Sequence, residues 1–278
     1  MNVLEFTLVV WAASALAGFL GALTGLGGGV VVTPVLTIML GVDLRYAIGA
    51  TLVSVIATSS GAAAAYVREG YSNIRIGLFL EIATTIGAVL GAFLATRTPS
   101  SALAIIFGVI LLYSAYLSSR PRSSKERQVQ PDPLATRLQL NGSFPENGKL
   151  RQYNVTGVRK GFALMFGAGT LSGLLGIGSG AVKVIAMDQA MKIPFKVSTA
   201  TSNFMIGVTA AASAGVYLSR GYIDPGLAMP VMLGVLVGSL LGARKLMGAE
   251  TRLLRHVFAI VVGALALEMI WHGISGKI

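Results

Sequence analysis

The feature that most constrains this chain is a series of apolar runs that recurs along almost its whole length. A bilayer core of about 30 Å requires roughly 20 apolar residues in each crossing helix, and most of the runs approach that length. Only 12% of the 278 residues are charged, and the mean hydropathy is +0.75. Soluble domains carry about twice that share of charge. We therefore expect an integral membrane protein built from helices.

The apolar runs form two groups on either side of a polar stretch. The predicted helical segments are 6–23, 30–40, 46–66, 75–96 and 101–119 in the first group, and 157–175, 181–191, 197–218, 225–243 and 252–272 in the second. The polar stretch is rich in Arg, Lys, Pro, Gln and Asn, which is typical of a partly disordered loop. The expected parts are a first transmembrane repeat (1–119), a basic cytoplasmic loop (120–154) and a second transmembrane repeat (155–278).

The two groups match each other at a constant offset of 150 to 151 residues. The segment Gly25–Gly29 (GLGGG) corresponds to Gly176–Gly180 (GIGSG), and the dipeptide Ala50-Thr51 corresponds to Ala200-Thr201. Further pairs follow in the same order, including Gly70-Tyr71 with Gly221-Tyr222. Self-similarity at a fixed period indicates an internal duplication.

The distribution of basic residues bears on the orientation of the two repeats. If each glycine-rich segment is the tip of a hairpin, 17 basic residues share one face and four lie on the other, namely Arg45, Arg97, Arg220 and Lys277. If every apolar run crosses the membrane, the basic residues divide between both faces. The positive-inside rule favours the hairpins. The predicted fold is all-α: a polytopic membrane protein of two inverted repeats, each with a glycine-tipped broken-helix hairpin plus three spanning helices, a common transporter design.

The glycine-rich segments are the first candidate site. A helix broken at membrane depth exposes backbone N–H groups, which is tolerated only inside protein or beside a cavity. The helix that restarts there points its positive end at the same place and favours an anion. The predicted substrate contacts are Gly27, Gly28, Gly29, Gly178, Ser179 and Gly180. Glycines at four-residue spacing, such as Gly87 and Gly91, are interpreted as close helix-packing positions.

Lys183 follows the second glycine-rich segment, whereas its counterpart in the first repeat is Val32. Ionisable residues at membrane depth usually have a function, and an ammonium group would hold an anion by its charge. The alternative is a structural ion pair, for example with Asp188. Glu81 is a candidate carrier of a coupling proton, with a neutral hydrogen-bonding role as its alternative.

Hydroxyl and amide side chains begin the helices that follow the glycine-rich segments. They would donate to anionic oxygens if these helices flank the hairpin tips, while helix-to-helix hydrogen bonding is the competing interpretation. The candidates are Thr51, Ser54, Thr201, Ser202 and Asn203.

Other classes of function find little support in the sequence. There is no Cys, and the two His residues lack the spacing of metal ligands, so we expect no metal, no cofactor and no enzyme. Ser179 between two glycines leaves an intramembrane hydrolase as an alternative, although no His partner is evident for it. The basic residues lie in loops between apolar runs, which does not indicate nucleic acid.

Taken in order and twice over, these motifs resemble the sulfite exporter TauE/SafE family. The resemblance rests on the two glycine-rich segments, the Ala-Thr helix starts and the turn Arg220–Asp224, and it covers about residues 10–119 and 157–272. It implies transport of a small sulfur-containing anion, such as sulfite or an organosulfonate like sulfoacetate, often outward. It also implies that both glycine-rich segments, with Thr51 and Thr201–Asn203, hold the substrate. Ser179 departs from the glycine common in the family, and the cysteines of thiosulfate-transporting relatives are missing.

The sequence therefore predicts a multi-pass transporter of the cell inner membrane that works by alternating access. A passive anion channel is the alternative within the same fold. The expected partners are a small anion and the lipid bilayer, without nucleic acid, and a homo-oligomer is allowed for.

Overall fold

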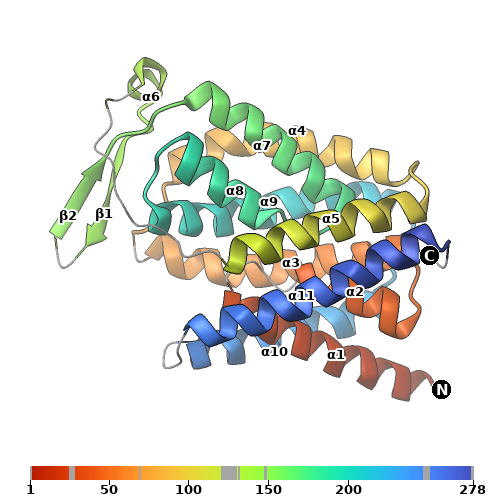
Figure 1. Cartoon of the computed structure of the whole chain (residues 1–278). Coiled ribbons are helices and arrows are strands. Elements are labelled where there is room, and N and C mark those ends of the chain that lie inside the picture. Colours follow the sequence, from red (N-terminus) through yellow and green to blue (C-terminus); the bar gives the residue numbers. More distant parts are fainter. Residues whose placement is uncertain are drawn as a thin grey trace.

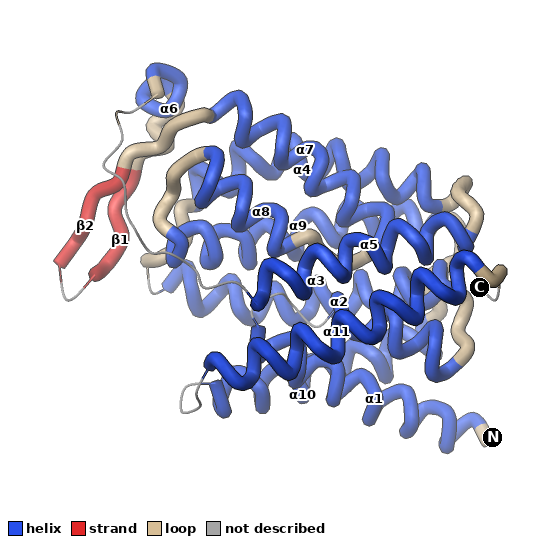
Figure 2. The backbone as a smooth tube through the Cα atoms, in the orientation of Figure 1, coloured by secondary structure: helices blue, strands red, loops and turns tan. Residues whose placement is uncertain are grey.

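The computed structural model describes residues 2–24, 29–68, 70–119, 130, 132–146, 149–246 and 251–276. The first half contains α1 (Val3–Thr24), α2 (Gly29–Pro34), the π-helical turn η1 (Val35–Met39), α3 (Leu44–Arg68), α4 (Ile74–Ala95) and α5 (Ser100–Ser119). The second half contains α7 (Val158–Leu175), α8 (Gly180–Ile185), the π-helical turn η2 (Ala186–Ala190), α9 (Phe195–Ser219), α10 (Pro225–Leu246) and α11 (Thr251–Ile274). Within these described ranges the structure is all-α apart from one small hairpin (Figures 1 and 2).

The helices predicted from the apolar runs are confirmed, with ends that differ by a few residues. The two short segments need one refinement, because each begins as an α-helix and continues as a wider π turn. The two halves carry the same elements in the same order. Their turns also agree, since Gly70 and Gly221 precede α4 and α10 with the same left-handed φ of 75°.

The main helix interfaces join one half to the other. The first helix of each half packs against a later helix of the other half: α1 packs against α10, and α7 packs against α4. The corresponding helices α3 and α9 pack together, and so do α5 and α11. Both termini lie at one end of the bundle, opposite the end that carries α6 and the hairpin (Figure 1).

Two of these interfaces are close backbone contacts made possible by glycine. A Cβ on Gly87 or Gly173 would overlap the backbone of the partner helix across the α4–α7 interface. A Cβ on Gly18 or Gly238 would do the same across α1–α10. The interpretation of the four-residue glycine spacing as a packing device is confirmed at Gly87 and at its counterpart Gly238.

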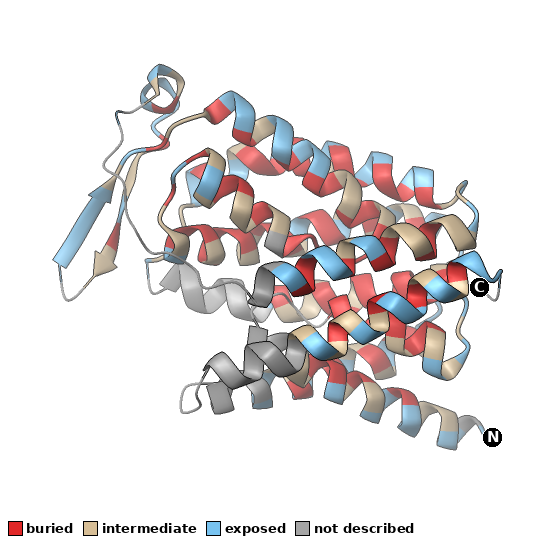
Figure 3. Cartoon of the chain, viewed as in Figure 1, coloured by how far each residue is buried: buried red, intermediate tan, exposed pale blue. Residues whose placement is uncertain are grey.

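The outer surface of the bundle is apolar. Leu78, Ile82 and Ile86 follow one another at four-residue spacing on α4, and each is more than half exposed. Figure 3 shows buried residues on the inner sides of the helices and exposed residues on their outer sides. By length and composition α4 is the one helix of the described residues that could span a membrane unaided, and shorter apolar stretches occur in α1, α3, α5, α10 and α11.

The polar segment between the halves is more ordered than expected where the structure describes it. It forms α6 (Pro133–Arg137) and an antiparallel hairpin of β1 (Gly142–Glu146) and β2 (Lys149–Tyr153). The expectation of partial disorder therefore does not apply to these residues, because composition does not reveal their packing, while a cytoplasmic location of the segment stays a prediction. Phe144 and Val155 are buried in one cluster with Ile76 and Met191 from the bundle.

Candidate functional site

The two glycine-rich segments meet inside the bundle. A Cβ on Gly29 would lie 2.9 Å from the Cγ2 of Thr51 on α3 and 3.6 Å from the carbonyl oxygen of Gly176. A Cβ on Gly178 would lie 2.8 Å from Ile206 on α9 and 3.3 Å from Val55 on α3. Gly29 thus lies against α3, and Gly178 lies between α3 and α9.

The first half contributes hydroxyl groups to this region. The Oγ1 atoms of Thr33 on α2 and Thr51 on α3 are 2.8 Å apart and share a hydrogen bond, and both residues are buried. Ser54 is also buried, but its hydroxyl donates to the carbonyl oxygen of Ala50 in its own helix, 2.9 Å away. The Thr51 hydroxyl therefore links α3 to α2, whereas the Ser54 hydroxyl is hydrogen-bonded within α3. Gly27 and Gly28 lie outside the described residues.

The second half contributes a hydroxyl group that makes no hydrogen bond to the described residues. Ser179 precedes α8 in a left-handed conformation with φ 45°, and its Oγ is buried without a partner there. Ser202 on α9 donates to the carbonyl oxygen of Gly180, at 3.3 Å. A buried hydroxyl without a partner loses its hydration and gains nothing in return, so Ser179 is suited to bind something that enters the site.

Lys183 is the most unusual residue of this region, because its side chain is fully buried with 0% exposed. Its Nζ donates to the Oγ1 of Thr209 on α9 at 2.5 Å, and that hydroxyl lies 2.6 Å from Oε1 of Glu81 on α4. Glu81 is 6% exposed, and its carboxylate attracts the ammonium group of Lys183 electrostatically. The described contacts of Lys183 are thus with Thr209 and Glu81, which are not the residue Asp188 named as an example of a structural partner. A buried lysine is rarely found unless it is paired, and Thr209 and Glu81 supply the pair.

Among the described residues, these polar contacts are made at one of the two positions that the repeat relates. At the offset of 151 residues, Lys183, Thr209 and Glu81 correspond to Val32, Thr58 and Met232. Thr58 keeps the hydroxyl but donates to the carbonyl oxygen of Ser54, 2.9 Å away in its own helix. The buried charges are therefore a departure from the symmetry of the two halves.

Two predicted site residues lie apart from this cluster. The Oγ1 of Thr201 accepts a hydrogen bond of 3.0 Å from the backbone N of Asn73, in the turn before α4. Asn203 is partly exposed. Thr209 is the residue that sequence reasoning missed, since a lone threonine in an apolar helix gives no motif. Its one available sign was the matching Thr58 in the other repeat.

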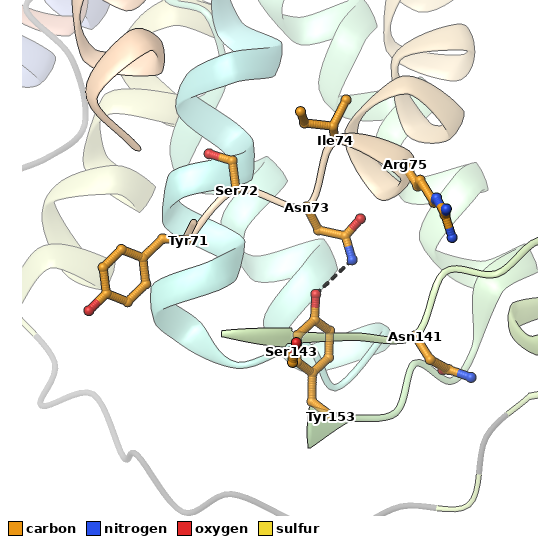
Figure 4. A pocket seen from close by; sticks show the side chains of 8 residues that line it. All are labelled: Tyr71, Ser72, Asn73, Ile74, Arg75, Asn141, Ser143 and Tyr153. Atoms are coloured by element: carbon orange, nitrogen blue, oxygen red, sulfur yellow. Dashed lines mark hydrogen bonds between the residues drawn. The ribbon is translucent and has the colours of Figure 1, made fainter. Parts of the chain in front are cut away.

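An open groove of about 280 Å³ lies at the end of the bundle near Thr201. The turn residues Tyr71–Arg75 line one side, and Asn141, Ser143 and Tyr153 of the central segment line the other (Figure 4). Asn73 donates to the hydroxyl of Tyr153 at 2.7 Å, which fastens the hairpin to the bundle. Burial raises the pKa of the Tyr153 hydroxyl to about 12, while the hydrogen bond from Asn73 acts in the opposite direction.

Comparison with known proteins adds to this geometry. The sequence model of the family described as "Sulfite exporter TauE/SafE" matches residues 10–269. The chain is 27% identical over 268 residues to the "Probable membrane transporter protein YunE" of Bacillus subtilis, covering 93% of this chain and 95% of that one. It is 26% identical to a "Probable membrane transporter protein" of Xylella fastidiosa, covering 96% of each chain. It is 24% identical to MJ0441 of Methanocaldococcus jannaschii, also named a probable membrane transporter, covering 92% of each. No solved structure gives a significant match.

Proposed function

Because the chain belongs to the sulfite exporter TauE/SafE family, we propose that this membrane transporter moves a small sulfur-containing anion, such as sulfite or sulfoacetate. The direction we propose is outward, from the cytoplasm across the inner membrane. Transport proceeds by alternating access, in which the site opens to one side of the membrane at a time.

The observation that carries this proposal is the meeting of both broken helices beside a fully buried lysine. Ser179 directly precedes α8, four residues before Lys183, and its hydroxyl has no hydrogen-bond partner among the described residues. Backbone N–H groups, hydroxyl groups and an ammonium group are the donors that suit an oxyanion. The proposed substrate contacts are Gly27–Gly29, Thr51, Ser54, Gly178–Gly180, Lys183 and Thr201–Asn203. Because Lys183 is 0% exposed, the anion reaches it only when the helices around it separate.

We also propose that the two halves are inverted repeats. Three features support this arrangement: the reciprocal pairs α1–α10 and α4–α7, the matched pairs α3–α9 and α5–α11, and termini that lie opposite the central segment. Inverted repeats give transporters two related conformations, in which the halves exchange roles. A reporter fused to the C-terminus should face the periplasm, and a cytoplasmic signal would contradict this topology.

The two alternatives differ from the proposal in what they need from the site. A passive channel needs a continuous pathway, whereas Lys183 and its neighbours are closely packed in this conformation. A hydrolase needs a base beside Ser179, whereas the described residues place no hydrogen-bond partner on that hydroxyl.

Counterflow of labelled sulfite in proteoliposomes tests the proposal. We expect saturable exchange that unlabelled sulfite and sulfoacetate suppress more strongly than taurine, sulfate or thiosulfate, with the substrate chemically unaltered. Flux without counterflow would indicate a channel, and an altered product would indicate a hydrolase.

Variants of Lys183 test in the same assay whether this residue belongs to the substrate site. Lys183→Ala should weaken exchange, and Lys196→Ala, which removes an exposed lysine at the start of α9, should not. Since Lys183→Ala leaves Glu81 buried without its partner, the double variant Lys183→Met with Glu81→Gln serves as a neutral version of the site. Wild-type exchange in both Lys183 variants would exclude Lys183 from the substrate site.

A further inference from the structure

Thr209 connects two buried charges that come from different helices. Its hydroxyl accepts a hydrogen bond from Lys183 on α8 and lies within donating distance of Glu81 on α4. All three residues are buried, and Thr209 and Lys183 are both 0% exposed. The positive and negative charges are thus held in one hydrogen-bonded chain across three helices.

The hydroxyl of Thr209 has one proton and two acceptors within reach. Oε1 of Glu81 lies at 2.6 Å, and the carbonyl oxygen of Met205 in the same helix lies at 2.9 Å. A hydroxyl can donate only one hydrogen bond at a time. A charged carboxylate is the stronger acceptor, and a protonated carboxyl group would let the hydroxyl turn back to Met205. Thr209 can therefore respond to the charge of Glu81 without moving its backbone.

Glu81 also has an oxygen that remains available. Oε1 accepts from Thr85 at 3.2 Å as well as from Thr209, whereas Oε2 is buried and has no hydrogen-bond partner among the described residues. A buried carboxylate oxygen without a donor is costly, and protonation of that oxygen would remove the cost.

The described residues of the helices packed against α4 provide no second buried charge that could take the place of Lys183. The helices packed against α4 are α7 and α9. In the described part of those helices, the charged groups are Arg159 and Lys160 at the start of α7 and Lys196 at the start of α9, and all three are exposed. The electrostatic attraction that Glu81 experiences comes from the ammonium group of Lys183.

We infer that Glu81 is a proton-binding site linked through Thr209 to Lys183, so that an anion binds at Lys183 together with a proton at Glu81. The inference rests on the proposed function. In the structure the lysine and the carboxylate balance each other, and an anion arriving at Lys183 would leave excess negative charge in a buried site. A proton from the aqueous phase that forms an O–H bond at Oε2 restores the balance. No bond in the substrate breaks. Thr209 is a positioning residue: its hydroxyl is hydrogen-bonded to both groups, so a change in the charge of one group alters its hydrogen bond to the other.

The test counts protons taken up when the anion binds. The full-length protein in detergent is titrated with sulfoacetate, which stays fully ionised near neutral pH, in two buffers that differ in ionisation enthalpy. The difference between the two binding enthalpies, divided by the difference between the two buffer ionisation enthalpies, gives the number of protons taken up per anion. We expect about one in the wild type. Glu81→Gln should bind the anion with about zero protons taken up.

The threonine variants test the link itself. Thr209→Val keeps the shape without the hydroxyl and should lose at least half of the proton uptake, and Thr209→Ser should restore it. Thr58→Val is the matched control, because it removes the repeat-related hydroxyl, which belongs with the uncharged repeat mates Val32 and Met232. This variant should take up the wild-type number of protons. If Thr209→Val fails to fold, the comparison between Thr209→Ser and Glu81→Gln still decides whether uptake depends on this chain of groups.

Three results would overturn the inference. Anion binding by the wild type without proton uptake would leave the proposed function standing and remove the coupling. Equal proton uptake in Glu81→Gln would place the proton elsewhere. Absence of both binding and flux for every sulfur anion, in wild-type protein shown to be folded, would remove the proposed function and the inference together.

Discussion

Replacing Gly173 by alanine should destabilise the protein by forcing α4 and α7 apart. A Cβ at this position would overlap the carbonyl oxygen of Ala88 and lie 2.7 Å from the backbone N of Ala92, although Cβ atoms essentially never approach closer than 3.0 Å. Both obstacles are backbone atoms of α4, so no side-chain rotation can relieve the contact. The two helices would have to separate by roughly 0.5–1 Å, which removes a quarter to a half of the dispersion energy at each affected contact.

The expected cost follows from the same geometry. Overpacking a close-packed site costs about 1–3 kcal/mol, and the upper part of that range applies here because the obstacle is backbone. Gly167→Ala is the matched control on the same helix, since a Cβ at that position meets nothing within 4 Å. Replacing glycine by alanine in a helix without new contacts gains up to about 1 kcal/mol of helix propensity.

The assay is reversible unfolding in mixed micelles with increasing denaturing detergent, followed by circular dichroism. Gly173→Ala should unfold at a clearly lower detergent fraction than the wild type, and Gly167→Ala should unfold at the same fraction or a higher one. Equal midpoints for Gly173→Ala and Gly167→Ala would refute the argument that the α4–α7 distance is fixed by backbone contact.

The remaining predictions concern the other interface, the central segment and the first half of the site. Gly238→Ala should lower the unfolding midpoint about as much as Gly173→Ala, because its Cβ would overlap the carbonyl oxygen of Ala15 across α1–α10; a midpoint like that of Gly167→Ala would contradict this. Tyr153→Phe removes the hydrogen bond to Asn73 and should cost about 1 kcal/mol, seen as faster proteolysis within the hairpin, and an unchanged cleavage rate would argue against that anchor. Because the pKa of Tyr153 is raised to about 12 from 10.0, its contribution to stability is complete below pH 10 and is lost as the pH rises toward 12; the difference in tyrosinate absorbance between the wild type and Tyr153→Phe should show ionisation in that upper range and not near pH 10. Thr51→Val breaks the contact with Thr33 and should cost about 0.5–1.5 kcal/mol in the same unfolding assay, whereas Thr51→Ser should keep most of it.

Much of the fold could be predicted because a membrane helix is recognised from the apolar character of consecutive residues. Apolar length fixed the helices, and the repeated glycine-rich segments located the two breaks, since both are properties of consecutive residues. The order of the central segment was missed. Phe144 and Val155 gain their burial from Ile76 and Met191, which are remote in sequence, and composition alone does not contain that contact.

The candidate site was predictable in part for the same reason. Lys183 and Glu81 are conspicuous as single charges in apolar runs, and each could be selected alone. Their connection could not, because it passes through Thr209, which lies 26 residues from Lys183 and 128 from Glu81. Thr201 stays a prediction: its place in the helix after the second glycine-rich segment suggested a substrate contact, and in this conformation its hydroxyl accepts a hydrogen bond from the backbone N of Asn73.

The π turns η1 and η2 bear on how such a chain arose. Each is closed by a six-residue hydrogen bond at the same place, from Val42 to Leu36 at 3.1 Å and from Ile193 to Met187 at 3.0 Å. Two π turns at repeat-related positions are what the duplication of one shorter chain would produce. That shorter ancestor would have needed two identical chains to bring two broken helices together, and every charge in such a pair appears twice. A single polypeptide is free of this restriction, so one half can carry Lys183 where the other carries Val32.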